Sequence, residues 1–514
     1  MTATEPDHRF SRRDTALLAG VSLVALLSQL LVSGRYGYFR DEFYYFACGE
    51  HLDWGFIDQP PFVALAAFFV RHVLGESLLA IRFLPAVCNA LVVFLTGLMA
   101  RELGGGRFAQ GLAALATLIA PVYLIICHIF SMNCFDHVIW ALAAYIVIKI
   151  LKEDRPRLWV LFGVVAGVGL MNKYSVGFLG MGLVVGLLLT PARKHLTSKW
   201  LWLGGAIAFL FFLPHIVWEF QHGFPTREFI HNATLHKNLP MSPFAFMAES
   251  ILQILPFTFP LWLAGLYFFL LAEPGKPFRA LGWIYVAVLG LFLATNAKPY
   301  YLAPAYYMLF AAGAVQVESF IRARQWNWLK PACATALTLG GLVSLPYSLP
   351  VLRVETFIRY QDWLGLRPGS GERGPSGKLP QMYADMFGWE NQVATVARVY
   401  NTLTPEEKAR TMIFCSNYGE AGAIDFLGKT YGLPKAASGH NNYWFWGPGN
   451  WEADMVITVG ESREEVEKSF EDVQLAATVV SEYARPFETN MPIYIGRKPK
   501  MPLKDVWPRA KEFI

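Results

Sequence analysis

The stretch YGYFRDEFYYFACGEHLDWGFIDQPPF, residues 36–62, follows directly on a long apolar segment and mixes carboxylates with many aromatic side chains. Its acids include Asp41, Glu42, Asp53 and Asp58. Aromatic side chains are enriched where a membrane meets water, but an ionisable side chain beside a membrane-embedded segment is costly and usually functional. The stretch therefore predicts a membrane boundary at which carboxylates carry out chemistry. A solvated loop charge is the simpler alternative for any single acid.

The composition of the whole chain indicates an integral membrane protein. Of the 514 residues, 54% are hydrophobic, 15% are aromatic and only 16% are charged. Soluble domains usually carry about 25% charged residues, so charge is depleted here. The formal net charge of +5 is small for this length and does not suggest a nucleic-acid partner.

Apolar segments long enough to span a bilayer follow one another along the first two thirds of the chain. The expected spans are 15–34, 78–100, 108–128, 137–151, 157–171, 174–191, 200–220, 244–271, 280–296, 301–321 and 331–351. The first is longer than a typical signal-peptide core, and no small-x-small cleavage site follows it, which favours a transmembrane helix over a signal peptide. The sequence thus predicts a polytopic α-helical membrane protein with about 11 transmembrane helices.

Basic residues indicate the orientation of these spans. With the N-terminus in the cytoplasm, every predicted inner loop is basic, whereas the short outer turns hold few cations. The basic residues on the inner side are Arg9, Arg12, Arg13, Arg101, Arg107, Lys149, Lys152, Arg155, Arg157, Arg193, Lys194, Lys199, Lys276, Arg279, Arg322, Arg324 and Lys330. An odd number of helices then leaves the C-terminus outside. We expect a multi-pass protein of the bacterial inner membrane with an extracytoplasmic C-terminal domain.

The composition changes near residue 352. The segment GLRPGSGERGPSGKLP (365–380) is typical of a linker. Beyond it, 411–416, 454–460 and 475–482 are expected to be strands, and 390–403 and 462–473 to be helices, which suggests a small α/β domain. The expected organisation is a transmembrane catalytic domain over 1–351, a linker over 352–381 and an α/β domain over 382–514.

The topology gathers polar residues on the outer side. The first outer loop, 35–77, contains the segment PPFVALAAFFVRHVLG (60–75), which predicts a helix lying in the outer interface. The remaining candidates in outer turns are Asp136, His137, Asn172, Lys173, His231, Asn232, His236, Lys237, Lys298, Tyr300 and Tyr301. Each one alone could be a snorkelling or capping residue. Acids from two loops and cations from two others on one side favour a functional site.

This mixture of side chains suits group transfer from a lipid-linked phosphate. A carboxylate can take a proton from a nucleophilic acceptor, and lysine can stabilise the growing charge of a phosphate leaving group. An activated lipid carrier would be the natural donor, because no nucleotide-sugar reservoir is expected outside the cell. The chain has no P-loop or GxGxxG motif on the cytoplasmic side. A divalent metal on Asp41, Glu42, Asp58 or the loop histidines is a further hypothesis, although the spacing is not diagnostic.

The sequence resembles the GT-C superfamily of glycosyltransferases, in the branch related to protein O-mannosyltransferases and lipid A aminoarabinose transferases (family 39, or the RgtA/B/C/D-like group). The matching motifs are RDEFYY with LDWGFIDQPPFVAL, NCFDHVIWAL, GLMNKYSVGFL and NAKPYYLAPAYYML. The resemblance covers about residues 15–350. It implies a GT-C fold, a polyprenyl-phosphate sugar donor and an extracytoplasmic site.

The resemblance also implies roles for individual residues. Asp41 matches the first-loop aspartate that is the usual catalytic base, with Glu42 as its companion, and Asp136 matches a second acid near the donor phosphate and acceptor. Four residues match positions near the donor phosphate: Lys173, Lys298, Tyr300 and Tyr301. Aminoarabinose transferases have a lysine immediately before the Pro-Pro pair, where this chain has Gln59. That departure puts both the aminoarabinose donor and a lysine–phosphate contact there in doubt.

The C-terminal segment SGHNNYWFWGPGNW (438–451) combines Trp444, Trp446 and Trp451 with amide side chains. Aromatic and amide groups suit an acceptor sugar or the membrane interface, and a buried structural loop is the alternative. Residues 413–426 place Asn417 and Glu420 between a strand and a helix, as in a ligand-binding crossover.

The function expected from these patterns is transfer of a sugar from a polyprenyl phosphate to an envelope acceptor, which could be a protein, lipopolysaccharide (its lipid A) or another glycan. Asp41 would be the base, Asp136 and Glu42 would assist it, and Lys173 and Lys298 would neutralise the phosphate. Acceptor contacts would come from Asp58, Gln59, His231, His236, Trp444 and Trp446. A transporter or flippase with an extracytoplasmic sensing domain is the alternative, but transporters favour repeats and midplane polar residues.

Overall fold

The computed structural model describes residues 12–366, 368–369 and 372–514, so Arg9 lies outside the described residues. The chain folds into two compact units. The first, here called the helical unit, comprises 12–33, 82–214 and 240–351. The second, the mixed unit, comprises 34–81, 215–239 and 352–514. The sequence grouped the first outer loop with the transmembrane domain, whereas in the structure this loop packs with the C-terminal residues.

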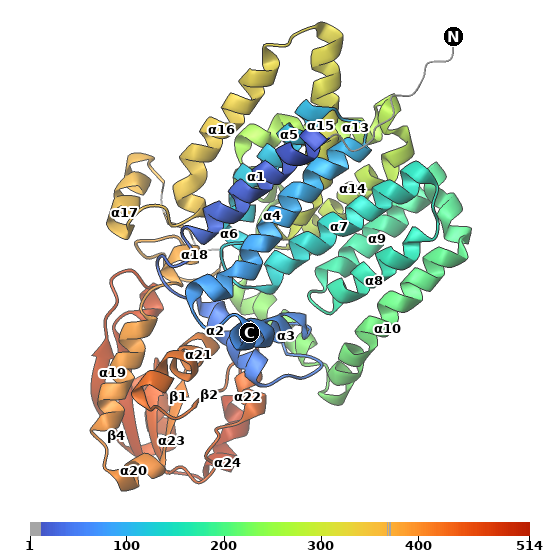
Figure 1. The fold of residues 1–514 in the computed structure, drawn as a ribbon. Helices are drawn as coiled ribbons and strands as arrows, with labels where there is room; N and C mark the ends of the chain where they lie inside the picture. Colours follow the sequence, from blue (N-terminus) through green and yellow to red (C-terminus); the bar gives the residue numbers. More distant parts are fainter. Residues whose placement is uncertain (1–11, 367, 370–371) are drawn as a thin grey trace, which may run out of the picture. The chain divides into compact units, whose positions relative to one another are not determined.

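The helical unit is built of apolar helices (Figure 1), and each of the eleven expected spans falls on one helix or a consecutive pair. The helices are α1 (Arg12–Leu30), α4 (Leu78–Glu102), α5 (Arg107–Ile119), α6 (Pro121–Ile126), α7 (Met132–Glu153), α8 (Leu158–Leu170), α9 (Ser175–Leu188), α10 (Lys199–Gln221), α12 (Pro243–Gln253), α13 (Phe259–Leu270), α14 (Arg279–Thr295), α15 (Tyr306–Arg324) and α16 (Leu329–Ser348). The 3₁₀ segments η1 (Pro191–Thr197), η3 (Pro256–Thr258), η4 (Glu273–Phe278) and η5 (Pro299–Ala305) lie between them.

By length and composition, five helices of the described chain can cross a membrane, or up to seven if each of two bent pairs is one span. The bent pairs are 175–188 with 191–197, at 114°, and 243–253 with 256–270, at 96°. Proline begins the second member of each pair and cannot continue the preceding helix. The count of eleven transmembrane helices therefore stays a prediction.

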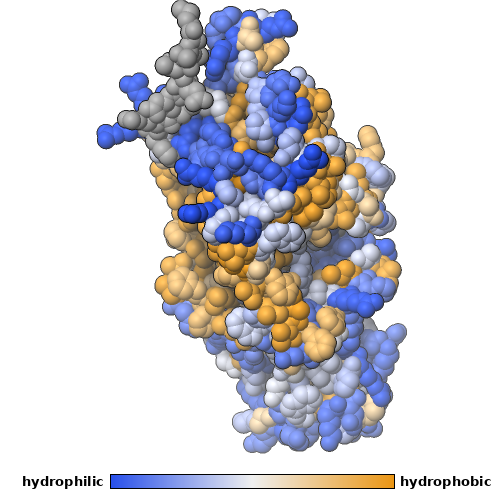
Figure 2. All heavy atoms as spheres, turned by 90° about the vertical axis from the view of Figure 1, so that its right-hand side faces the viewer, coloured by the Kyte–Doolittle hydropathy of each residue, from blue (hydrophilic) through white to orange (hydrophobic). Residues whose placement is uncertain are grey.

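The outside of the helical unit is largely apolar. Figure 2 shows hydrophobic side chains gathered in a broad area over this unit. On α10, Trp202, Phe209 and Leu210 are 68%, 54% and 62% exposed. Such an area is unfavourable in water and suits lipid tails.

Close packing inside the helical unit depends on glycine. Helices α13 and α15 approach so closely that a Cβ added at Gly265 would lie 2.0 Å from the Leu309 carbonyl oxygen. A Cβ at Gly313 would lie 1.9 Å from the Leu261 carbonyl oxygen. Small residues at helix crossings let backbones approach in this way in membrane proteins.

We expect Gly313→Ala to destabilise the helical unit by about 1–3 kcal/mol, because the added methyl group must push two backbones apart. Gly290→Ala on α14 is the matched control, since a Cβ there meets nothing within 4 Å. Thermal unfolding of the two detergent-purified variants measures the difference. Equal midpoints would contradict the importance of this crossing.

The mixed unit contains a five-stranded sheet with strand order β2-β1-β3-β5-β4. The strands are β1 (Thr411–Cys415), β2 (Ala436–Ser438), β3 (Met455–Val459), β4 (Phe470–Val479) and β5 (Met491–Pro499). Strands β1, β2 and β3 are parallel, whereas β5 is antiparallel to β3 and to β4.

The remaining elements of the mixed unit are mostly short helices. They are α2 (Arg40–Glu50), α3 (Phe62–Val73), α11 (Pro225–Asn232), η2 (Ala233–Lys237), α17 (Val354–Trp363), α18 (Gln381–Ala384), α19 (Trp389–Asn401), α20 (Pro405–Ala409), α21 (Tyr418–Leu427), η6 (Gly428–Tyr431), α22 (Asn442–Trp446), α23 (Arg463–Ser469), η7 (Pro486–Glu488), α24 (Leu503–Val506) and η8 (Trp507–Ala510). The helix expected over 60–75 is present as α3. The acidic stretch before it, which carried no helix prediction, forms α2.

The α/β expectation for the C-terminal residues is confirmed, but the boundaries around β4 are wrong: the strand expected over 475–482 begins at Phe470 and ends at Val479. The helix expected over 462–473 ends at Ser469, and residues 470–473 begin β4. They pair with β5, with Phe470 opposite Pro499 and Asp472 opposite Arg497. Sheet pairing overrides the local helical pattern of this charged segment.

Candidate functional site

The acidic stretch of the first outer loop forms the first turn of α2. The buried Glu42 carboxylate accepts the backbone N–H of Phe39 at 2.8 Å, which satisfies an otherwise unpaired donor at the helix start. Aromatic packing holds the next turn, since Phe43 and Phe46 contact Phe426 of α21. Glu42 therefore stabilises the element that carries Asp41.

Asp41 is the accessible acid of this turn. Its side chain is 32% exposed, and its Oδ1 accepts the Tyr418 hydroxyl at 2.9 Å. The same oxygen lies 3.6 Å from Nε of Arg40. One face of the carboxylate is thus fixed by neighbouring side chains, while the rest remains open to an incoming hydroxyl group.

A buried network of ion pairs around Arg40 supports Asp41. Arg40 is 9% exposed, lies 3.9 Å from Glu372 and 4.0 Å from Asp385, and places its guanidinium 5.6 Å from the centre of the Tyr418 ring. Arg485 also contacts Glu372, at 3.3 Å. Buried charges need such partners to offset the loss of hydration.

Sequence reasoning missed this network. Arg40 and its acidic partners are more than 300 residues apart in the chain, so no local pattern connects them. Lys237 was noted as an outer-loop cation without a specific role, and its Nζ lies 3.8 Å from Glu372.

Asp58 lies in the loop between α2 and α3. The Tyr44 hydroxyl donates to its Oδ1 at 2.8 Å, and Asn442 accepts the adjacent Ile57 N–H at 2.7 Å. Burial raises the pKa of Asp58 to about 6. The neighbouring Gln59 is fully buried, with its amide 3.8 Å from the Cys48 sulfur. Asp58 is partly buried, whereas Gln59 faces the protein interior.

The other candidates of the mixed unit occupy different places. His231 and His236 are exposed on α11 and η2. Trp446 stacks on His51 at 4.5 Å between ring centres, and Trp444 donates from its indole nitrogen to the Trp507 carbonyl oxygen at 3.2 Å. Both tryptophans are partly buried and contribute to packing.

Asp53 is exposed and has a structural partner. Its Oδ2 accepts the indole N–H of Trp218 at 2.8 Å.

A second cluster lies in the helical unit. Asp136, on the first turns of α7, is 2% exposed and accepts the Ser175 hydroxyl at 2.5 Å. Lys173, in the turn between α8 and α9, donates to Asn133 at 2.6 Å. Its ammonium lies 4.6 Å from the centre of the Tyr301 ring.

The late motif adds aromatic groups to this cluster. The Tyr300 ring centre is 5.6 Å from the Lys173 ammonium and 4.6 Å from the Tyr301 ring centre. Lys298 precedes η5 and is partly buried. The structure thus brings Asp136, Lys173 and the two tyrosines together in the helical unit, as a site for a charged group next to aromatic surface.

Among the described residues, no group of three or more His, Cys, Asp or Glu side chains is arranged to hold a metal ion. Asp41, Glu42 and Asp58 do not form such a group. Their carboxylates instead accept separate hydrogen bonds, from the Tyr418 hydroxyl, the Phe39 N–H and the Tyr44 hydroxyl.

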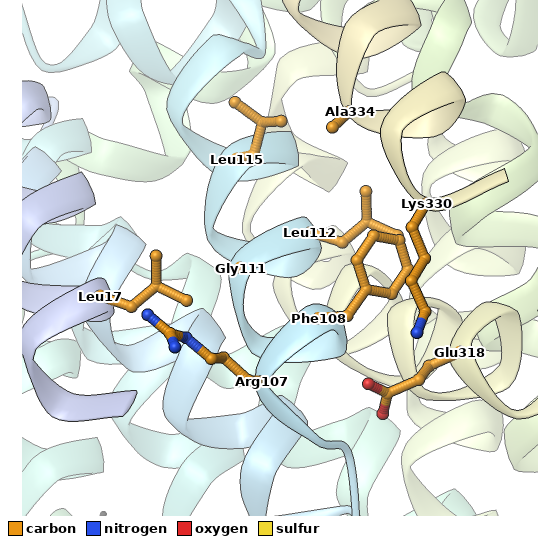
Figure 3. Close-up of a pocket in the computed structure, with 9 residues that line it drawn as sticks. All are labelled: Leu17, Arg107, Phe108, Gly111, Leu112, Leu115, Glu318, Lys330 and Ala334. Atoms are coloured by element: carbon orange, nitrogen blue, oxygen red, sulfur yellow. The ribbon is translucent and has the colours of Figure 1, made fainter. Parts of the chain in front are cut away.

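A pocket of about 530 Å³ lies elsewhere in the helical unit (Figure 3). Arg107 and Lys330 line it together with Glu318, and several leucines form its apolar wall. Glu318 accepts the Gly106 N–H at 2.6 Å at the start of α5, which gives this acid a capping role. None of the residues expected at the site from the sequence lines this pocket.

The chain is similar to known glycosyltransferases. A family model described as dolichyl-phosphate-mannose-protein mannosyltransferase matches residues 58–218. The lipid A galacturonosyltransferase RgtD of Rhizobium johnstonii is 23% identical over 322 residues. That match covers 61% of this chain and 66% of the relative's length.

Two solved structures share the fold. ArnT from Cupriavidus metallidurans, in a crystal structure bound to undecaprenyl phosphate, has a TM-score of 0.56 at 17% identity, over 93% of this chain and 97% of that one. An oligosaccharyltransferase from Archaeoglobus fulgidus has a TM-score of 0.51 at 14% identity, over 83% and 65% of the two chains. The resemblance to the GT-C superfamily is confirmed, and the fold is ArnT-like.

Proposed function

We propose, proceeding from this GT-C resemblance, that the protein is a membrane glycosyltransferase that moves a sugar from a polyprenyl phosphate to an acceptor on the outer face of the bacterial inner membrane. The family model names a dolichyl-phosphate sugar enzyme, and the ArnT structure holds undecaprenyl phosphate. The observation that carries the proposal is Asp41, a partly exposed carboxylate held against a buried ionic network.

In the proposed reaction, an acceptor hydroxyl attacks the anomeric carbon of the donor sugar. Asp41 takes the hydroxyl proton as the new carbon–oxygen bond forms. The bond between the anomeric carbon and the phosphate oxygen breaks, and the polyprenyl phosphate leaves with its electron pair. Lys173 and Lys298 stabilise that negative charge, while Tyr300 and Tyr301 contact the donor. Asp136 accepts the Ser175 hydroxyl and thereby orients the turn that carries Lys173.

Asp58 is assigned to the acceptor. Its pKa near 6 keeps most of the carboxyl ionised at neutral pH, where it accepts hydrogen bonds from sugar hydroxyls. We assign a lipid A-type glycolipid as the acceptor class, because the curated relative is named for lipid A. His231 and His236 are exposed, and we assign them to acceptor contacts as well. Because Gln59 is fully buried, we assign it no direct contact with the acceptor.

The test supplies detergent-solubilised membranes and purified protein with a panel of polyprenyl-phosphate sugars and with lipid A. Release of polyprenyl phosphate and a mass increase of one sugar on lipid A are the expected results. Modification of a protein or another glycan would keep the enzyme class and change the acceptor. Movement of lipid across vesicles without release of polyprenyl phosphate would identify a flippase instead and overturn the proposal.

A further inference from the structure

A cavity of about 330 Å³ lies against one face of the sheet in the C-terminal part of the mixed unit. Its floor consists of alternate residues of two strands, Met412 and Phe414 of β1 with Val456 and Thr458 of β3. Side chains alternate between the faces of a strand, so these four share one face. The volume falls at the lower end of the range for small-molecule sites.

The cover of the cavity is firmly held. The Trp507 indole N–H donates to the Trp444 carbonyl oxygen at 3.0 Å, and the Trp444 indole N–H donates to the Trp507 carbonyl oxygen at 3.2 Å. A Cβ at Gly439 would lie 1.6 Å from the Ala510 carbonyl oxygen, and the Glu512 N–H donates to Gly439 at 2.9 Å. The cavity is therefore preformed.

The position of the cavity favours ligand binding. Ser416, Gly439 and Glu461 line it, and each follows the carboxyl end of one of the parallel strands β1, β2 and β3. In open α/β sheets, ligands bind outside this edge.

One lining hydroxyl has no partner. Thr458 is 4% exposed, and its Oγ1 makes no hydrogen bond within the described residues. A buried polar group without a partner is costly. This hydroxyl can accept a hydrogen bond from a group inside the cavity.

Acids outnumber cations among the residues that line the cavity. Glu461, Glu465 and Glu512 line it, together with Lys468 and the exposed Arg509. Lys468 pairs with Glu465. Glu461 has neither a hydrogen bond nor an ion pair in the part of the chain that the structure describes, and burial, followed by Glu512 and Glu465, raises its pKa to about 7. A bound cation would relieve this repulsion.

We propose that this cavity binds a small amphipathic amine, with its ammonium group between Glu461, Glu512 and the Thr458 hydroxyl and its apolar body on Phe414 and Trp507. Ammonium donors match the carboxylate and hydroxyl acceptors of the cavity lining, and the aromatic side chains beside them supply apolar surface. The site is distinct from Asp41 and from the Lys173 cluster.

Calorimetric titration of the full-length protein in detergent with phenethylamine tests this site. Its neutral and anionic analogues, phenylethanol and phenylacetate, are the ligand controls. Saturable binding of the amine alone is expected. Glu461→Gln should weaken it about tenfold or more, whereas Glu464→Gln, in the first turn of the following helix α23 and outside the cavity lining, should leave it unchanged.

Thr458→Val separates binding from folding. It removes the unpartnered hydroxyl, so the unfolding midpoint should stay equal or rise while amine affinity falls severalfold. Val456→Trp should fill the cavity and abolish binding. Equal binding of the three probes, equal affinity in the Glu461→Gln variant, or no saturable heat up to roughly 10 mM amine would overturn the proposal.

Discussion

Asp41→Asn is expected to lower the rate of sugar transfer by about 10²–10⁴-fold, the range for loss of a general base. Asparagine has the same size and can still accept the Tyr418 hydroxyl bond that Asp41 accepts at 2.9 Å. The substitution removes the capacity to take a proton, together with the negative charge that faces Arg40 at 3.6 Å. The folded protein should therefore remain intact, with an unfolding midpoint close to that of the unmodified protein.

The measurement is polyprenyl-phosphate release under saturating donor and acceptor, so that the change appears in kcat. Asp53→Asn is the matched control, because it makes the same substitution in the same loop at an exposed acid bonded to Trp218. Full activity of the Asp41→Asn variant would remove Asp41 from the mechanism.

Lys173→Met is expected to lower kcat by about 10²–10³-fold, comparable with removal of one preorganised charge-stabilising donor. Methionine keeps an unbranched side chain next to Tyr300 and Tyr301 but carries no charge. The departing phosphate would then lose its main counter-charge. Lys173→Arg keeps the charge and should recover part of the activity, since arginine also binds phosphate.

Lys330→Met is the control for this second experiment, because Lys330 is a partly buried cation of the same unit that lines a different pocket. Comparison of kcat with KM for the donor distinguishes the roles. A rise in KM alone would make Lys173 a binding residue with no effect on the leaving group, and unchanged kinetics would exclude it from the donor site.

Hydropathy predicted the helical unit well. Long apolar runs of this kind favour helices, and every expected span from 15–34 to 331–351 falls on helix. The ends of the helices were harder to predict. Helices α9 and α12 stop at bends that contain proline, and hydropathy averaged along a segment does not reveal such bends. The late motif around Tyr300 and the turn at Lys173 were also identified, and they meet in the fold.

The support of Asp41 could not be predicted in the same way. It depends on Arg40, Glu372 and Asp385, whose contacts join residues more than 300 positions apart. Strand β5 escaped prediction because its residues, 491–499, follow a proline-containing turn and end in a basic segment. Long-range pairing decides such elements, and one sequence does not reveal it.

The hydrogen bond between Asp41 and Tyr418 has a consequence for protein engineering. The proposed base and the residue that orients it lie far apart in the chain but in one compact unit. A chimera that exchanged only residues 352–514 with a relative would combine a native loop with a foreign partner. A graft of residues 34–81, 215–239 and 352–514 together would keep Asp41 with its native partners.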